Sequence, residues 1–144
     1  MIDYVGMVWH WHHSRYLAEF CYSLDERVEF IDKHKPEHER ALRKQLLKPV
    51  LGDLPRELVA AGKARYDLWK ACVKAREAYA EAGRKAYANK WQAYKKACKA
   101  YDTWRAYDKI YNKHLPLIEK LHQEECPNCP WDGNTIFPEE AKND

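Results

Sequence analysis

The residues best suited to chemistry in this 144-residue chain are a histidine and two cysteines near its carboxyl end. His122, Cys126 and Cys129 have the spacing H-x3-C-x2-C. Imidazole nitrogens and thiolates are common zinc ligands, and a Cys-Pro-x-Cys turn directs backbone N–H groups toward the thiolates, as in a zinc knuckle. Because His122 and Cys126 are four residues apart, they would share one face of a final helical turn. The spacing therefore predicts three ligands of a structural zinc ion.

A fourth ligand has to come from a distant part of the chain, because structural zinc normally has four protein ligands and the sequence has no second C-x2-C pair. In an extended amino-terminal segment, the side chains of alternate residues would face the same side, and this favours His10 together with His12. A catalytic zinc is the alternative, and it requires an open coordination position and a neighbouring acid–base group. The candidates for the fourth ligand are His10, His12, His13 and Cys21, and those for the acid–base group are Glu19, Glu124 and Glu125.

The stretch from Lys63 to Lys113 contains no proline, a single glycine and five Ala-Tyr dipeptides spaced six to eight residues apart. A spacing near seven residues is close to two turns of an α-helix, and it creates one wide apolar stripe of alanine and aromatic side chains. This stripe could be covered in two ways. The chain could turn back near 83–89 to form an antiparallel helical hairpin, or it could continue as a rod of about 75 Å that packs on a second copy.

The predicted metal site favours the hairpin. A straight rod would hold the amino-terminal histidines tens of ångströms from Cys126, which is too far for one ion to be shared within a chain. A hairpin brings both ends of the stretch to the same place. The two predictions therefore depend on each other, unless the metal is bound between chains.

The segments that flank this stretch are also predicted to be helical. An apolar pattern with a 3.6-residue period begins after Ser14, a possible N-cap, and ends at Lys35-Pro36. A second helix is expected from Pro36 to Lys48, and Pro116 should interrupt the chain before a last short helix. We therefore expect an all-α fold in a single domain, 1–144. Its parts are a helical base (1–55), a coiled-coil arm (56–113, with its tip near 83–89) and a short helix followed by the Cys-x2-Cys tail (114–144).

Charge is distributed unevenly along the chain. The stretch from Lys63 to Lys113 has 14 Lys and Arg residues against 5 Asp and Glu residues, whereas the flanking segments are net acidic. A basic, tyrosine-rich helical arm could hold a phosphate backbone, although lysines also keep an alanine-rich helix soluble. If nucleic acid binds, the contacts are expected from Lys85, Lys90, Lys95, Lys96 and Lys99.

The cysteine content bears on the compartment. Five cysteines are an odd number, and the chain has neither a recognisable secretory signal nor an apolar run long enough to span a membrane. These features favour a cytoplasmic protein with reduced thiols over a disulfide framework. Cys72 and Cys98 lie within the apolar stripe, where we expect small buried side chains that could face each other in a hairpin.

The tail CPNCPWDGNTIFP, residues 126–138, looks like one half of a zinc ribbon, although the second cysteine pair of a ribbon is missing. Together with the HWHH start and the Ala-Tyr heptads, it resembles small uncharacterised proteins of phage and metagenomic origin that differ in heptad number. The resemblance covers most of the chain and implies no activity. It implies a hairpin of adjustable length, and the cytoplasm of a host cell if the protein is phage-encoded.

No sequence motif identifies a reaction, because Gly-rich phosphate loops, G-x-S-x-G and H-E-x-x-H are all lacking. We expect a non-enzymatic helical scaffold or protein-interaction module, stabilised by structural zinc, whose partner is another protein or a second copy of the chain. Nucleic-acid binding through the basic arm is the first alternative, and a zinc-dependent hydrolase is the second. No association with membranes is expected.

Overall fold

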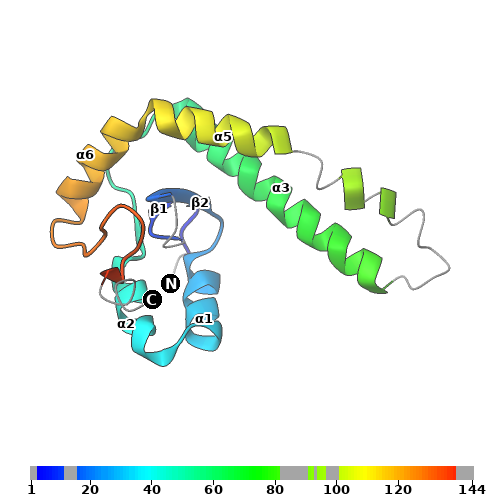
Figure 1. Cartoon of the computed structure of the whole chain (residues 1–144), viewed down its shortest axis with the longest axis horizontal. Helices are drawn as coiled ribbons and strands as arrows, with labels where there is room; N and C mark the ends of the chain where they lie inside the picture. The colour runs from blue at the N-terminus through cyan, green and yellow to red at the C-terminus, as the bar shows by residue number, and fades with distance from the viewer. Residues whose placement is uncertain (1–2, 12–15, 82–90, 93, 97–100, 139–144) are drawn as a thin grey trace. The chain divides into compact units, whose positions relative to one another are not determined.

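The computed structural model describes residues 3–11, 16–81, 91–92, 94–96 and 101–138 (Figure 1). The chain divides into two compact units. The first, which we call the base, combines Met1–Pro55 with His114–Asp144, and the second, the arm, is Arg56–Lys113. Each unit is described by itself below.

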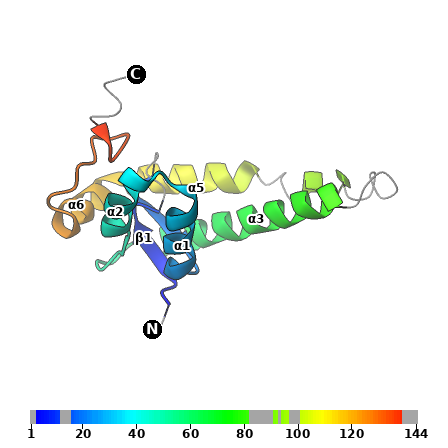
Figure 2. The same ribbon diagram turned by 90° about the horizontal axis from the view of Figure 1, so that it is seen from below.

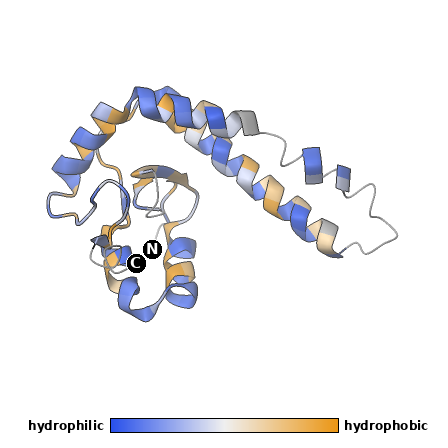
Figure 3. Ribbon diagram, viewed as in Figure 1, coloured by the Kyte–Doolittle hydropathy of each residue, from blue (hydrophilic) through white to orange (hydrophobic). Residues whose placement is uncertain are grey.

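The base contains a small antiparallel sheet with the strand order β2-β1-β3. Its strands are β1 (Gly6–Trp9), β2 (Ala18–Cys21) and β3 (Lys48–Pro49). Trp9, in the central strand, lies opposite Ala18 on one side and Lys48 on the other. All of β2 and most of β1 are buried, and Figure 3 shows hydrophobic residues concentrated in these strands. The sheet therefore supplies much of the apolar core of the base.

The predicted all-α class is wrong, because the fold is mixed. The helix expected to begin after Ser14 is divided: β2 takes Ala18–Cys21, and α1 (Leu24–His34) begins only after Ser23, whose hydroxyl accepts a hydrogen bond from the Glu26 N–H at 3.1 Å. The apolar residues of β2 happen to fit a helical period, and periodicity cannot separate a short buried strand from a helical segment. Pairing with β1 decides between the two, because it satisfies the backbone of both strands.

The predicted interruptions at prolines are confirmed. α1 ends at His34, and Pro36 is the N-cap of α2 (Glu37–Leu46). At the other end of the chain, α5 (Tyr101–Lys113) is separated by His114 from α6 (Leu115–Glu125), which has Pro116 in its first turn. A proline lacks the N–H that a helix interior requires, so helices start there rather than continue. Among the described residues, no helix is both long and apolar enough to cross a lipid bilayer.

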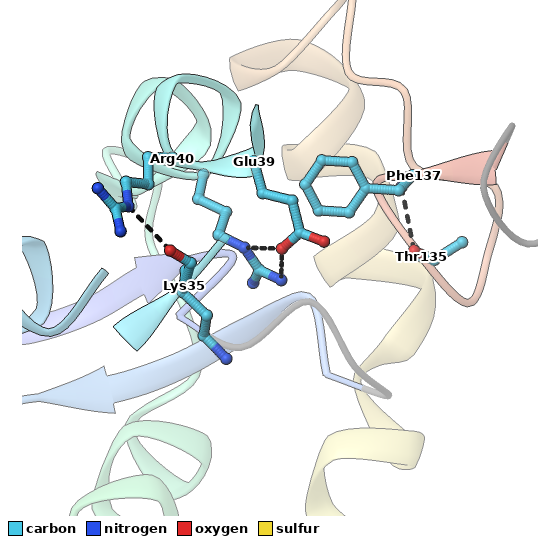
Figure 4. A network of polar contacts seen from close by, with 6 residues as sticks. Lys35, Glu39, Arg40, Thr135 and Phe137 are labelled. Atoms are coloured by element: carbon cyan, nitrogen blue, oxygen red, sulfur yellow. Dashed lines mark hydrogen bonds and ion pairs between the residues drawn. The ribbon is translucent and has the colours of Figure 1, made fainter. Parts of the chain in front are cut away.

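A buried ion pair fastens α2 to the tail of the base (Figure 4). The Arg43 guanidinium donates to the Glu39 carboxylate from Nε at 2.8 Å and also from Nη2, and both side chains are almost fully buried. The same guanidinium lies over the Phe137 ring, 5.2 Å from its centroid. Ile136, the next residue in the tail, is buried in one cluster with Leu46 and Cys126. Arg43 thus connects the ion pair within α2 to the segment that follows the two cysteines.

The arm contains two long helices that run antiparallel, α3 (Arg56–Glu81) and α5. Lys113 donates to Glu57 at 3.0 Å, and the Arg65 guanidinium lies 3.8 Å from the centroid of the Trp104 ring. Figures 1 and 2 show the two helices side by side. This arrangement is the one that a hairpin requires, and a continuous rod is excluded. The predicted tip near 83–89 lies outside the described residues.

One cysteine departs from the expectation of reduced thiols throughout. Cys72 of α3 is disulfide-bonded, whereas Cys21, Cys126 and Cys129 are free. Cys98, which we expected to face Cys72 in a hairpin, lies outside the described residues. Reduced thiols are therefore a property of the base and not of the whole chain.

The buried ion pair of α2 predicts a large effect of a small substitution. Glu39→Gln removes the carboxylate that accepts both Arg43 donors, and breaking a buried pair in this way costs about 3–5 kcal/mol. The matched control is Glu29→Gln, which removes the i,i+4 partner of Lys33 on the exposed face of α1 and should cost about 0–1 kcal/mol. The free energy of unfolding of the base, obtained from the denaturant dependence of amide exchange in α1 and α2, compares the two. Equal losses would contradict a structural role for the pair.

Candidate metal centre

The structure brings together four side chains that could hold one metal ion: His10, His122, Cys126 and Cys129. Their ligand atoms all lie within 4.8 Å of one another. The two Nε2 atoms are 3.0 Å apart, and the Cys129 sulfur is 3.2 Å from the Nε2 of His10. A tetrahedral zinc ion, with bonds of about 2.0 Å to nitrogen and 2.3 Å to sulfur, places its ligand atoms roughly 3.3–3.8 Å apart. Small side-chain adjustments would therefore accommodate a single ion.

The end of α6 positions two of the ligands, and the turn after it positions the third. The Cys126 N–H donates to the His122 carbonyl at 2.8 Å, so these residues lie one helical turn apart, as their spacing predicts. The Cys129 N–H then donates to the Cys126 carbonyl at 3.2 Å. The local backbone thus directs both thiols to one point.

His10 reaches the cluster because the backbone turns sharply after β1. Its N–H donates to the Leu17 carbonyl at 2.9 Å, which continues the pairing between β1 and β2. Its φ angle is 54°, in the left-handed region, where a residue other than glycine costs about 1–2 kcal/mol. The His10 ring centroid lies 5.0 Å from that of His122 and 5.9 Å from that of Trp131. The surrounding structure holds His10 in a strained conformation that presents its imidazole to the other ligands.

The other candidates for the fourth ligand do not join this cluster or cannot be placed. Cys21 lies in β2, fully buried, and its thiol donates to the Tyr4 carbonyl at 3.8 Å. His12 and His13 lie outside the described residues. Among the candidates that the structure describes, His10 is therefore the one that completes a four-ligand set with His122, Cys126 and Cys129.

A second layer of contacts fixes the end of α6, and it centres on Glu125. This carboxylate accepts hydrogen bonds from the N–H groups of Leu51 at 2.6 Å and Gly52 at 3.0 Å, and from the Trp9 indole at 3.2 Å. The Lys48 ammonium donates to the Glu125 carbonyl at 3.2 Å. Burial acts to raise the pKa of Glu125, but these donors and the charge of Lys48 together hold its pKa below the ordinary value. Through these contacts, Glu125 links the end of α6 to the 48–52 segment and to β1.

Sequence reasoning did not find this second layer. It considered Glu125 only as a possible acid–base group, and it assigned no role to Trp9 or Lys48. No local pattern links Trp9 to Glu125, because 116 residues separate them. The Trp9 ring also contacts His122 edge-on, with centroids 5.4 Å apart, so it helps to orient a ligand directly.

The surroundings of the cluster determine which protonation states its side chains adopt. Burial lowers the pKa of His122, and the charge of Lys48 lowers it further, so this imidazole is held neutral, which is the form that binds metal. Burial raises the pKa of Cys129 to about 11. The nearby Trp131 N–H acts to lower this pKa, and the neighbouring Cys126 acts to raise it. A divalent cation reverses this preference, because it stabilises the thiolate. Metal binding would therefore displace the thiol protons.

The lysines expected to contact nucleic acid are only partly placed. Lys95 and Lys96 belong to the arm and are exposed. Lys85, Lys90 and Lys99 lie outside the described residues. The structure therefore describes two of the five side chains that the sequence indicated.

Comparison of the chain with protein-family models, with curated proteins and with solved structures finds no match. The resemblance to phage and metagenomic proteins thus stays a prediction from the sequence. The geometry of the cluster and the surface of the arm carry the functional argument.

The surroundings of Cys21 predict how slowly it reacts with alkylating reagents. Burial raises the pKa of this thiol to about 11, and only the thiolate is nucleophilic, so its reactive fraction near neutral pH is roughly 100-fold below that of an ordinary cysteine. Cys21 is also fully buried, so the reagent reaches its sulfur only when the structure opens. At pH 7 the iodoacetamide reaction of Cys21, followed by peptide mass spectrometry, should be roughly 100-fold or more slower in the native than in the denatured protein. Equal rates in the two states would contradict the burial of Cys21.

Proposed function

We propose that this chain is a non-enzymatic interaction module in which a structural zinc ion holds the base together and the arm supplies the binding surface. The observation that carries the proposal is the four-ligand cluster of His10, His122, Cys126 and Cys129. These ligands come from the two ends of the chain, and the metal would therefore connect segments that are otherwise distant in sequence.

The donor set favours zinc over other metals. Two imidazoles and two thiolates are the ligands of many structural zinc sites, whereas magnesium, calcium and manganese prefer oxygen. Among the described residues, the cluster contains no carboxylate.

Two features favour a structural over a catalytic ion. Four protein ligands fill a tetrahedral site, and a catalytic zinc keeps one position for water or substrate. The carboxylates considered for acid–base chemistry are also poorly placed for it: Glu19 is buried in β2, Glu124 is exposed, and Glu125 is occupied by three N–H donors. A hydrolase would need at least one of them beside an open metal position.

The metal would replace part of the apolar core that the base lacks. Leu, Ile, Val and Phe make up only a small part of the chain, and several buried positions of the base hold polar side chains instead, such as Glu39, Arg43 and His122. Zinc bound to a site that exists only in the folded state adds its binding free energy to folding. A base of this composition gains directly from such an ion.

The arm has the accessible surface that an interaction module requires. No described side chain between residues 63 and 106 is buried, although this part of the arm carries the stripe of alanine and aromatic residues. Figure 3 shows hydrophobic residues alternating with hydrophilic ones along α3. The pairing of α3 with α5 thus leaves apolar and aromatic area available to a partner.

Metal analysis is the first test of this proposal. Purified protein should contain about one zinc per chain, and the cobalt-substituted form should show the absorption of a tetrahedral site with two thiolates. His122→Ala and Cys126→Ser should abolish stoichiometric binding, whereas His34→Ala, at the exposed end of α1, and Cys21→Ala should retain it. Absence of metal from the unmutated protein, after growth and purification with zinc present, would overturn the proposal whether or not the variants fold.

The second layer predicts a difference between two adjacent glutamates. Glu125→Ala removes the acceptor of the Leu51, Gly52 and Trp9 donors, and losing such an outer-layer contact typically lowers metal affinity about 10- to 100-fold. Glu124→Ala changes an exposed neighbour and should leave the affinity unchanged. Competition with a chromogenic chelator measures both affinities. Equal affinities for the two variants would show that the hydrogen bonds of Glu125 do not support the site.

A further inference from the structure

The arm carries a pair of stacked aromatic rings beside exposed lysines. Trp91 and Tyr94 have ring centroids 5.4 Å apart and planes only 20° from parallel. Trp91 is 38% exposed although it belongs to a helical segment, and Lys95 and Lys96, which follow Tyr94, are both exposed. The pair presents an accessible aromatic surface with cationic groups next to it.

The tryptophan side chains are more exposed in the arm than in the base. Trp9 and Trp11 of the base are buried, and Trp9 also uses its indole N–H in a hydrogen bond. The arm leaves Trp69, Trp91 and Trp104 exposed, Trp69 by 51%. Of these, Trp104 has the Arg65 guanidinium over its ring. Large aromatic rings left accessible in this number are more typical of binding surfaces than of a core.

The charge around the stacked pair has a single sign in the sequence. From Arg84 to Lys99 the chain contains six Lys and Arg residues and no Asp or Glu. Two such segments laid side by side would repel each other, which disfavours a second copy bound arm to arm. A polyanion is attracted by the same charge.

We infer that the arm binds single-stranded nucleic acid at the surface formed by Trp91, Tyr94, Lys95 and Lys96. An accessible base stacks on the aromatic pair, and the lysine ammonium groups pair with the flanking phosphates. A double helix buries the flat faces of its bases, so it cannot use the aromatic pair in this way. The inference rests on the proposed function only in taking the arm as the binding element, and it names the partner of that arm.

The test uses the full, zinc-loaded chain and a fluorescently labelled oligothymidylate, with binding followed by anisotropy over a range of salt concentrations. Binding should weaken as salt rises, because phosphate contacts release counterions. Each lysine–phosphate contact contributes about 0.7 to the slope of log K against log salt for a single strand. Lys95→Glu with Lys96→Glu should therefore lower the slope by about 1.4 and reduce the affinity by at least about tenfold.

The aromatic contact has a separate signature. Trp91→Ala should weaken binding about 5- to 150-fold while leaving the salt slope unchanged, because stacking releases no counterions. The charge-matched control is Lys33→Glu with Lys120→Glu, two exposed lysines of the base, which should retain the affinity of the unmutated chain within about twofold.

Several results would overturn the inference. These are no binding at low salt, equal binding of a duplex of the same sequence, and an equal loss in the control and arm variants. Self-association that is lost with Trp91→Ala in the absence of oligonucleotide would assign the surface to a second copy. The zinc content of the same samples separates the two proposals, since a chain with one zinc that binds no oligonucleotide overturns this inference and leaves the structural zinc intact.

Discussion

The base depends on the meeting of His10 with His122, whose Nε2 atoms lie 3.0 Å apart although 112 residues separate them. Two imidazoles at this distance share at most one hydrogen bond, and His10 adopts a strained left-handed backbone to form it. The free energy gained from one hydrogen bond is small compared with the cost of ordering the turn that carries His10. A cation shared with Cys126 and Cys129 would supply a far larger stabilisation, and it would explain why His10 is held in this conformation.

The rest of the base is arranged so that this meeting is fixed from both sides. On the strand side, β1 sits between β2 and β3, and Trp9 immediately precedes the ligand His10. On the helix side, Glu125 immediately precedes the proposed ligand Cys126, and its carboxylate accepts a hydrogen bond from the Trp9 indole. The two residues next to the ligands are therefore bonded to each other. A polar second layer of this kind sets orientation more tightly than apolar packing would, because a hydrogen bond is directional.

The features predicted correctly from the sequence depend on residues a few positions apart, whereas the features that were missed depend on contacts between distant segments. The H-x3-C-x2-C spacing specified the end of α6 because four residues make one helical turn, and Pro36 and Pro116 marked helix starts because proline lacks an N–H. The sheet was missed because the four residues of β2 fit a helical period, and only pairing with β1 distinguishes the two states. His10 was found among several candidates only because zinc requires a fourth ligand. The role of Glu125 depends on contacts between distant segments, which spacing does not encode.

The separation of the chain into two units has a consequence for how its surfaces can change. All four proposed ligands, Glu125 and the three donors to its carboxylate belong to the base, so no side chain of the arm is needed to hold the metal. Exposed substitutions in the arm can therefore alter the surface of α3 and α5 while the side chains of the four-ligand cluster stay in place.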